Sequence, residues 1–73
     1  MKELELVVLR RSVPEHGLMP GDVGTIVHDY GNGSAYEVEF VLASGDTVAV
    51  LTLSREDIRE REGSEILHSR PVA

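Results

Sequence analysis

The side chains of this sequence best suited to bind a metal ion are His16, His28, His68, Asp22 and Asp29. Imidazole and carboxylate groups are both common ligands of zinc and similar ions. The spacing of these residues matches no helical or finger-type zinc motif, and the adjacent His28 and Asp29 would point to opposite faces of a strand. The sequence therefore predicts surface or loop histidines, no metal site and no cofactor.

Two glutamates form the second candidate for chemistry. Glu37 and Glu39 lie two residues apart and share one face of a predicted strand. Paired carboxylates can transfer protons when burial separates their pKa values. This pair faces away from the inferred core and has no base or cleft beside it. We therefore expect a solvated face that can attract an arginine-rich partner.

Other catalytic patterns are missing from the sequence. No serine lies in a Gly-x-Ser-x-Gly turn, and the glycine-rich stretch at residues 31–33 is followed by neither a Walker lysine nor a helix. A chain of 73 residues also has little room for a large apolar pocket. We therefore predict no catalytic residues and no enzyme activity.

Aromatic residues are few, which limits the kind of partner. The chain has two tyrosines, one phenylalanine and no tryptophan, whereas grooves for proline-rich peptides use several exposed aromatic residues. Tyr30 is the aromatic residue that we expect to contact a partner, because it ends a strand beside a hairpin. The predicted partner-binding residues are Tyr30, Glu37, Glu39 and His16.

Five β-strands are predicted to position these residues. Apolar and β-branched residues alternate or run together in them, at residues 4–10, 23–30, 35–42, 47–53 and 58–61.

The connections carry turn residues. Residues 12–21 are predicted as an irregular loop because they contain two prolines and two glycines. Residues 31–34 and 43–46 form hairpin turns. Residues 54–57 are predicted as one helical turn before the last strand, with Asp57 at the capping-box position.

The predicted core combines the apolar face of each strand with residues from the long loop. Leu18 and Met19 are expected to fold back and plug one end, and Gly24 is interpreted as relieving a strand bend rather than admitting a ligand. The buried side chains are predicted to be Leu6, Val8, Leu18, Val23, Ile26, Val38, Phe40, Val48, Val50, Leu53 and Ile58.

Charge and composition restrict the partners and the location. The net charge is −6, which disfavours binding to nucleic acid or anionic membranes and favours a basic protein surface. The chain has no cysteine, which excludes disulfides and thiol chemistry. It has no signal-peptide pattern and no apolar run long enough to cross a membrane. We therefore expect a cytoplasmic protein.

Three segments of the chain resemble a family of small bacterial proteins. The matches are PEHGL at residues 14–18, GDVGTIV at residues 21–27 and YEVEF at residues 36–40, and the resemblance covers about residues 4–60. The family is a domain of unknown function. The resemblance implies an SH3-like barrel, and it suggests genes that lie beside other small proteins, as those of antitoxins and immunity proteins do.

The GDVGTIV segment is also similar to the glycine turn of KOW-type barrels and to the barrel of the nitrile hydratase β-subunit. KOW domains hold nucleic acid with basic surface, but the loops here offer Glu15, Asp22, Asp29 and Asp46 with little lysine or arginine beside them. This departure disfavours RNA binding.

We therefore predict an all-β, five-stranded SH3-like barrel at residues 1–61, with one short helical turn before the last strand. Residues 62–73 are predicted as a C-terminal tail or an extra edge strand. The predicted function is a non-catalytic protein–protein interaction module, either antitoxin- or immunity-like or an accessory subunit. Its partner is another protein, of basic character, or a second copy of itself. The alternative is a KOW-like nucleic-acid-binding barrel.

Overall fold

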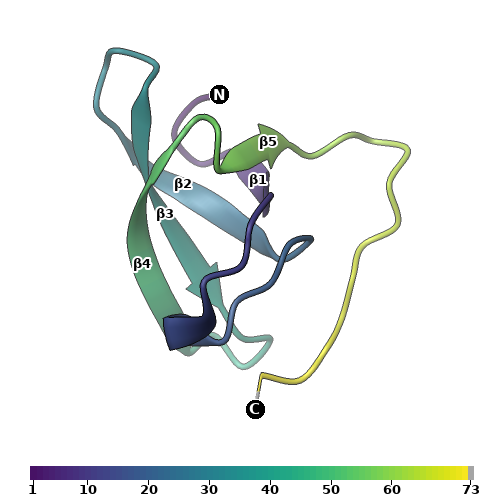
Figure 1. The fold of residues 1–73 in the computed structure, drawn as a ribbon. Helices are drawn as coiled ribbons and strands as arrows, with labels where there is room; N and C mark the ends of the chain where they lie inside the picture. The colour runs from purple at the N-terminus through teal and green to yellow at the C-terminus, as the bar shows by residue number, and fades with distance from the viewer. Residues whose placement is uncertain (73) are drawn as a thin grey trace.

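The protein is built from five antiparallel strands. The structure, a computed structural model, describes residues 1–72. A single 3-10 turn, η1 (Pro14–His16), and no α-helix occur in this range, which confirms the prediction of an all-β fold (Figure 1). The strands are β1 (Leu6–Leu9), β2 (Val23–Asp29), β3 (Ala35–Val41), β4 (Thr47–Ser54) and β5 (Ile58–Glu60).

The five strands form one sheet in the order β4-β3-β2-β1-β5. Each of the first three strands pairs with the next, so that β1 to β4 form an antiparallel meander, and β5 returns to pair with β1. The ladder ends at β4 on one side and at β5 on the other, so the sheet is not closed into a barrel. The SH3-like barrel therefore stays a prediction.

Two connections differ from their predicted form. Residues 55–57 make a hydrogen-bonded turn rather than a helical turn, because the chain enters β5 after a single bond from the Asp57 N–H to the Ser54 carbonyl (2.9 Å). The Asp57 carboxylate still accepts the Ser54 N–H (3.0 Å), as in a capping box. In the long loop, residues 14–16 form η1 instead of irregular chain, with Pro14 fixing the first angle and Gly17 ending the turn at φ 70°.

The core lies on the concave side of the sheet. It joins β1, β2, β3, β4 and β5 with two side chains from the long loop. The members are Val7, Leu9, Val13, Leu18, Ile26, Tyr36, Val38, Phe40, Ala49, Leu53 and Ile58. The predicted burial of Val8, Leu18, Ile26, Val38, Phe40, Leu53 and Ile58 is confirmed.

Other core predictions are wrong, and strand register explains most of them. In β1 the side chains of Val7 and Leu9 face the core, and Leu6 is half-buried. In β4, Phe40 pairs with Ala49 but Val41 pairs with Thr47, so Val48 is the extra residue of a bulge. The bulge shifts the alternation of inward and outward side chains along β4 by one residue.

The bulge in β4 leaves Ala49 buried and Val50 48 % exposed. Val23 and Val48 are half-buried. Leu18 is buried as predicted, but Met19 points to solvent.

Gly24 has a packing role that differs from the predicted relief of a bend. A Cβ at this position would lie 2.6 Å from Val38 Cγ1 and 3.1 Å from the Glu39 carbonyl oxygen. The irregularity of β2 lies further along, between Ile26 and His28. Glycine is therefore required because β3 packs closely against this point.

Residues 61–72 form no strand and return to the body of the protein. After β5 the chain swings away from the sheet and comes back toward η1 and the β3–β4 hairpin (Figure 1). The predicted division of the chain at residue 61 is not tested by this arrangement, and Ala73 lies outside the described residues. The return of the tail places several charged side chains beside the long loop.

Candidate functional site

The predicted residues Tyr30, Glu37 and Glu39 lie on the outward side of β2, β3 and β4. The Tyr30 hydroxyl donates to Glu37 Oε1 (3.1 Å), and the Thr52 hydroxyl donates to the same oxygen. Glu39 Oε2 accepts a hydrogen bond from the Thr47 hydroxyl (2.9 Å). Both carboxylates are half-buried and bonded by neighbouring hydroxyls. The outward face therefore has negative charge that can attract cations, and each of its two carboxylates accepts a hydrogen bond from a hydroxyl group.

Two further residues, His28 and Glu3, extend the outward face and were not among the predicted partner-binding residues. The rings of His28 and Tyr30 meet edge to face, with centroids 4.6 Å apart. His28 Nδ1 lies 3.7 Å from Glu3 Oε2. The strand register brings these residues together, since His28 pairs with Glu37 across β2 and β3.

The charge on the outward face affects the tyrosine. The hydrogen bond to Glu37 raises the pKa of Tyr30, and burial adds to this effect. Tyr30 therefore stays protonated at physiological pH and acts as a hydrogen-bond donor.

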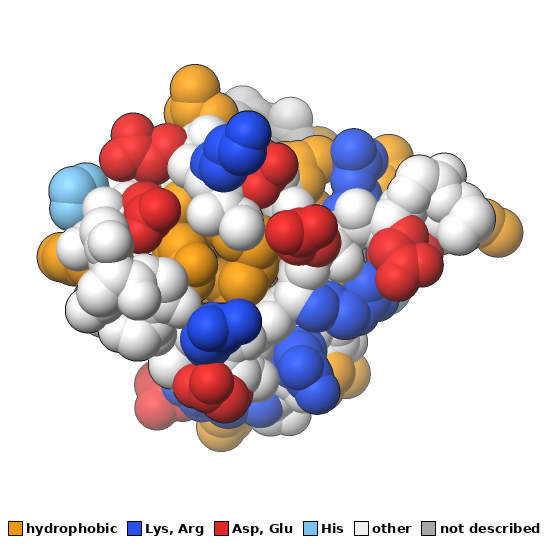
Figure 2. Space-filling view, turned by 90° about the horizontal axis from the view of Figure 1, so that it is seen from above, with side chains coloured by type: hydrophobic (Ala, Val, Ile, Leu, Met, Phe, Trp, Pro, Cys, Tyr) orange, Lys and Arg blue, Asp and Glu red, His pale blue; other side chains and the backbone are white. Residues whose placement is uncertain are grey.

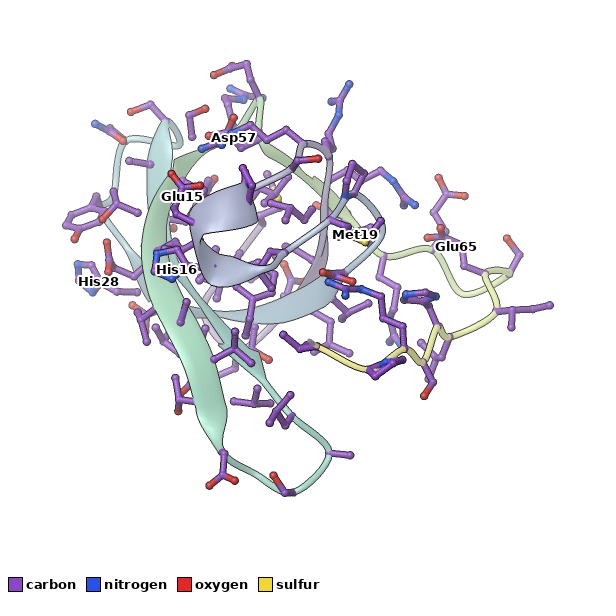
Figure 3. All side chains as sticks on the ribbon, turned by 60° about the horizontal axis from the view of Figure 1, so that its bottom comes forward. Glu15, His16, Met19, His28, Asp57 and Glu65 are labelled. Carbon is purple, nitrogen blue, oxygen red and sulfur yellow. The ribbon has the colours of Figure 1, made fainter. Side chains whose placement is uncertain are left out.

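His16 does not join this group. It ends η1 and is exposed, and its backbone N–H donates to the Val13 carbonyl (3.1 Å). Figure 3 shows His16 on η1 and His28 on a different element. Within residues 1–72, no hydrogen bond or ion pair joins the His16 side chain to Tyr30, Glu37 or Glu39.

A second site lies between the long loop and the C-terminal tail, around Asp22. The Asp22 residue is only 9 % exposed, and its Oδ2 accepts the Met19 N–H (2.8 Å) across the turn at Pro20 and Gly21. Arg70 binds the same carboxylate through one edge of its guanidinium, with Nε 2.9 Å from Oδ1 and Nη2 on Oδ2. The interaction spans 48 positions of the chain. Sequence reasoning considered Asp22 as a loop acid and as a candidate metal ligand, and it did not pair Asp22 with Arg70.

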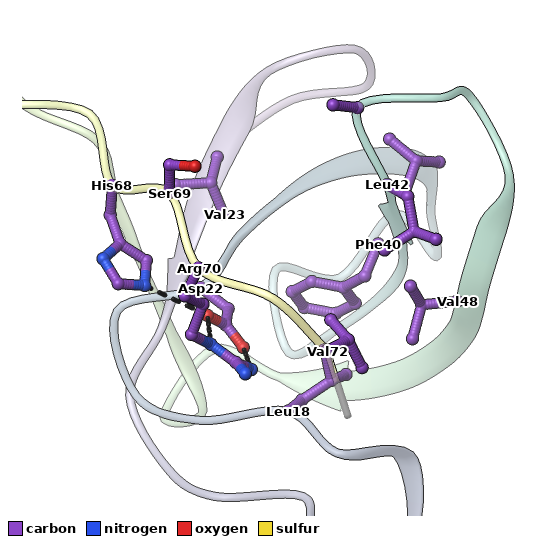
Figure 4. Close-up of a pocket in the computed structure, with 12 residues that line it drawn as sticks. Leu18, Asp22, Val23, Phe40, Leu42, Val48, His68, Ser69, Arg70 and Val72 are labelled. Carbon is purple, nitrogen blue, oxygen red and sulfur yellow. Dashed lines mark hydrogen bonds and ion pairs between the residues drawn. The ribbon is translucent and has the colours of Figure 1, made fainter.

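The loop backbone completes the arginine site. Arg70 Nη2 also donates to the Gly17 carbonyl oxygen (2.8 Å), so one guanidinium bonds a carboxylate and a main-chain acceptor at once. His68 Nε2 lies 3.8 Å from Asp22 Oδ1 on the same tail segment (Figure 4). The left-handed Gly17 at the end of η1 turns its carbonyl toward the arginine. The site is therefore built by the loop and selects a planar cation.

Opposing effects set the pKa of Asp22. Burial raises it, but the hydrogen bonds donated by Arg70 and by the Met19 N–H lower it, and so do the charges of Arg70 and His68. The net result is a pKa below the ordinary value of 3.8. Asp22 is therefore ionised at physiological pH and depends on a cation beside it.

A cavity with both polar and apolar lining adjoins the Asp22 carboxylate. It has a volume of about 290 Å³, and the side chains that line it include Leu18, Phe40, Val48 and Val72 (Figure 4). Val72 lies so close to the loop that a Cβ on Gly17 would be 3.3 Å from its Cγ1. The tail thus places an arginine against the acid and, two residues later, a valine against the apolar wall. We call this site, made by Gly17, Leu18, Asp22, Phe40 and Val48, the loop groove.

The base of the tail is held by a separate ion pair. Arg59 of β5 binds Glu65 through the two terminal nitrogens of its guanidinium, Nη1 and Nη2. Glu65 also accepts the Glu62 N–H (2.7 Å). The hydrogen bond from Arg59 lowers the pKa of Glu65 to about 2. A second cavity of about 220 Å³ lies under this part of the tail, lined by Val8, Ile66 and Leu67 among others. Val8 is buried on the side of β1 away from the core, whereas Ile66 and Leu67 are exposed.

Charges of both signs are spread over the surface. Figure 2 shows acidic and basic side chains together on one face, with apolar side chains between them, rather than a uniformly basic area. Over residues 1–72 the structure has no group of three metal-ligating side chains. No helix in the same range has the length and apolar character needed to cross a membrane.

Comparison with known proteins gives a family and no function. No curated protein and no solved structure shows detectable similarity to the chain. The family model described as "Domain of unknown function (DUF4926)" matches residues 3–60. This range contains all five strands and the long loop, and it ends before the tail that fills the loop groove. The chain therefore belongs to the DUF4926 family of domains of unknown function.

Proposed function

We propose that this domain is a non-catalytic protein-binding module whose loop groove holds an extended, arginine-bearing segment of a partner protein. The observation that carries the proposal is the protein's own tail, which lies in the groove as a ligand would. Arg70 is bound by Asp22 and the Gly17 carbonyl, and Val72 lies among the apolar side chains of the cavity.

The chemistry of the groove supports recognition of arginine over lysine. Two parallel hydrogen bonds match the planar guanidinium to the carboxylate, and a main-chain oxygen accepts a third. Lysine offers a single point charge and cannot fill this geometry. Partial burial of Asp22 strengthens the interaction, because water competes less for the carboxylate.

The remaining surface favours a basic partner. With a net charge of −6, the domain attracts positively charged proteins over distances of about one Debye length, roughly 8 Å at physiological salt. Tyr30, Glu37 and Glu39 add to this attraction from the outward face. His16 precedes Gly17 and is exposed, so it is the predicted residue best placed to contact a segment in the loop groove.

The barrel type, the class of partner and the location that the sequence predicts belong to the same proposal. An SH3-like barrel is supported by the antiparallel meander and by the return of β5 to β1. An antitoxin- or immunity-like partner, or an accessory subunit, is supported by the family resemblance and by the small size of the domain. We keep a cytoplasmic bacterial protein as the expected setting. Nothing specific favours the KOW-like alternative, and the net charge opposes it.

A peptide experiment tests the proposal. The probe is a synthetic peptide with the sequence of residues 66–73, added to the full-length Arg70→Ala variant, in which the competing guanidinium is gone. We expect NMR shift changes at Gly17, Leu18, Asp22 and Phe40. We expect weaker binding to the wild-type chain, because its own tail competes at an effective concentration on the order of millimolar.

Two controls isolate the arginine contact. A peptide with alanine in place of its arginine should bind Arg70→Ala at least about tenfold more weakly, a difference of about 1.4 kcal/mol. A peptide with lysine there should also lose affinity, because it cannot make the bidentate contact. Equal binding of the three peptides, or shift changes confined to the outward face, would contradict the proposed groove.

A further inference from the structure

The two edges of the sheet are protected very differently. The β5 edge is three residues long and contains Arg59 and Glu60. The β4 edge is eight residues long, with the sequence TVAVLTLS, and has no charged residue, proline or glycine. Natural sheets usually blunt an edge with charge, proline or shortness to prevent pairing with another chain. The β5 edge has two of these features, and β4 has none of them.

The backbone of β4 is available for pairing. In the part of the chain that the structure describes, β3 is the only strand that pairs with β4. The first part of the tail lies beside β1 and β5, and Val48 is the residue of β4 that lines a cavity together with the end of the tail. The N–H and C=O groups of β4 that point away from β3 therefore have no strand partner in this part of the chain, and the side chain of Val50 beside them is 48 % exposed.

We propose that β4 pairs with β4 of a second copy of this chain, antiparallel and about a two-fold axis, to join two five-stranded sheets into one. The sequence of β4 suits pairing with β4 of a second copy of the chain. Whichever residue lies on the axis, an antiparallel pair of TVAVLTLS strands sets only aliphatic residues, threonine and serine opposite one another. Such β-branched pairs stabilise a sheet.

Repulsion between the acidic chains does not oppose this arrangement. Within the strands of the joined sheet, the nearest acids are Glu37 and Glu39 on β3, one strand in from the edge. Asp46 directly precedes β4 and lies at the end of the paired segment, outside the strand. Three strand spacings would separate them from their copies, about 14 Å at 4.7–4.9 Å per strand. That distance exceeds the Debye length of about 8 Å at physiological salt. The strand carboxylates of the two copies therefore do not meet.

The same features predict that association stops at two copies. The two-fold pairing uses both β4 edges, and the outer edges of the joined sheet are then the two β5 strands. Those edges are short and charged, so they resist further addition. The product is a closed dimer rather than a filament.

Sedimentation equilibrium of the full-length chain from micromolar to millimolar concentration tests this. We expect the mass to rise to twice that of one chain for the wild type. The variant Val50→Lys should raise the dimer dissociation constant about tenfold or more, because the two-fold axis brings two like charges near one another. Circular dichroism shows whether each variant is folded.

A matched variant separates the β4 edge from a general loss of apolar surface. Val27 is 41 % exposed and lies on β2, between β1 and β3, so Val27→Lys should leave the dimer intact. Amide hydrogen exchange should show protection that grows with concentration at β4 and not at β5. A monomer at every concentration, or a dimer that Val50→Lys leaves unchanged, would overturn the proposal.

Discussion

Two carboxylate sites in this small protein have opposite characters. Asp22 is buried and takes its counter-ion from Arg70, far along the chain. Glu37 lies on the outward face and takes its hydrogen bonds from Tyr30 and Thr52, on adjoining strands. One acid depends on a segment outside the five strands, whereas the other is satisfied within the sheet.

The difference shows how burial gives a common residue type a specific role. A carboxylate in water gains little from a nearby cation, about 0–1 kcal/mol, because solvent and salt screen the pair. A partly buried carboxylate that accepts two guanidinium bonds gains more and also selects geometry. Asp22 is therefore suited to recognition, and Glu37 to solubility and long-range attraction.

The largest loss of stability is expected for a substitution at Gly24, within the sheet that supports both sites. Gly24→Val would place a side chain where Val38 and Phe40 already lie within 3 Å of the new Cβ. Overpacking of a core costs typically 1–3 kcal/mol, and a backbone oxygen also lies close, so we expect about 3 kcal/mol in the free energy of unfolding. Urea denaturation measures it. An unchanged midpoint would show that β2 and β3 are less closely packed than described.

A smaller loss is expected when Asp22 loses its charge. Asp22→Asn keeps the shape but removes the anion that Arg70 and the Met19 N–H bind, and hydrogen bonds to charged groups contribute about 1.5–3 kcal/mol each. We expect the free energy of unfolding to fall by about 1–3 kcal/mol. The NMR signals of the tail should broaden or move.

Glu56→Gln is the matched control for Asp22→Asn. Glu56 is exposed in the turn before β5, so its conversion to the amide should have almost no effect. Equal losses for the two variants would mean that the Asp22 pair is no stronger than a surface charge.

Acid should release the tail when the Asp22 carboxylate is protonated. The folded pKa of Asp22 lies below its ordinary value of 3.8. Its contribution is therefore complete above about pH 4 and is lost as the pH falls through the folded pKa. Arg70 and Val72 signals followed by NMR from pH 7 downward should move in this window in the wild type. Asp22→Asn should show no such transition.

Glu65 and Asp57 also have lowered pKa values, so global melting alone cannot assign the acid effect. For this reason the readout is the tail itself. A transition of the Arg70 signals well above pH 4 would contradict the assignment to Asp22, because a depressed carboxyl pKa acts only at lower pH.

The smallest effect is expected on the outward face. Tyr30→Phe removes the hydroxyl that donates to Glu37, but the Thr52 hydroxyl still donates to the same carboxylate. Surface changes of this kind alter stability by about 0.5 kcal/mol or less. The pH titration of Tyr30 should show a raised pKa that returns toward 10.0 in Glu37→Gln. If Tyr30→Phe lowered the free energy of unfolding as much as Asp22→Asn, the two sites would not differ in the way described.

Much of the strand pattern could be predicted because it depends on local sequence. Alternation of Tyr36, Val38 and Phe40 with Glu37 and Glu39 sets the inner and outer sides of β3. The glycine-rich hairpins also follow from local preference, since Gly31 and Gly33 have positive φ angles of 89° and 72°. These features need no knowledge of the partner strands.

The errors fall where distant contacts decide the outcome. A bulge at Val48 left Val50 exposed, and only pairing with β3 determines where a bulge forms. Of the predicted site residues, Tyr30, Glu37 and Glu39 lie together on the outward face. His16 lies apart from them on η1, and the local sequence around His16 does not show this separation. Asp22 was not paired with Arg70, because this arginine lies in the tail, beyond the segments used to predict the fold.

The sequence by itself determined an all-β chain, the polar and apolar faces of its strands, its acidic charge and its family, because composition, alternation and motif are local properties. Only the tertiary structure decided that the ladder ends at β4 and β5, that Gly24 must leave room for Val38, and that Arg70 binds Asp22. Those outcomes depend on which distant segments meet. One residue of register, or one guanidinium 48 positions away, decides whether a side chain is buried, exposed or paired.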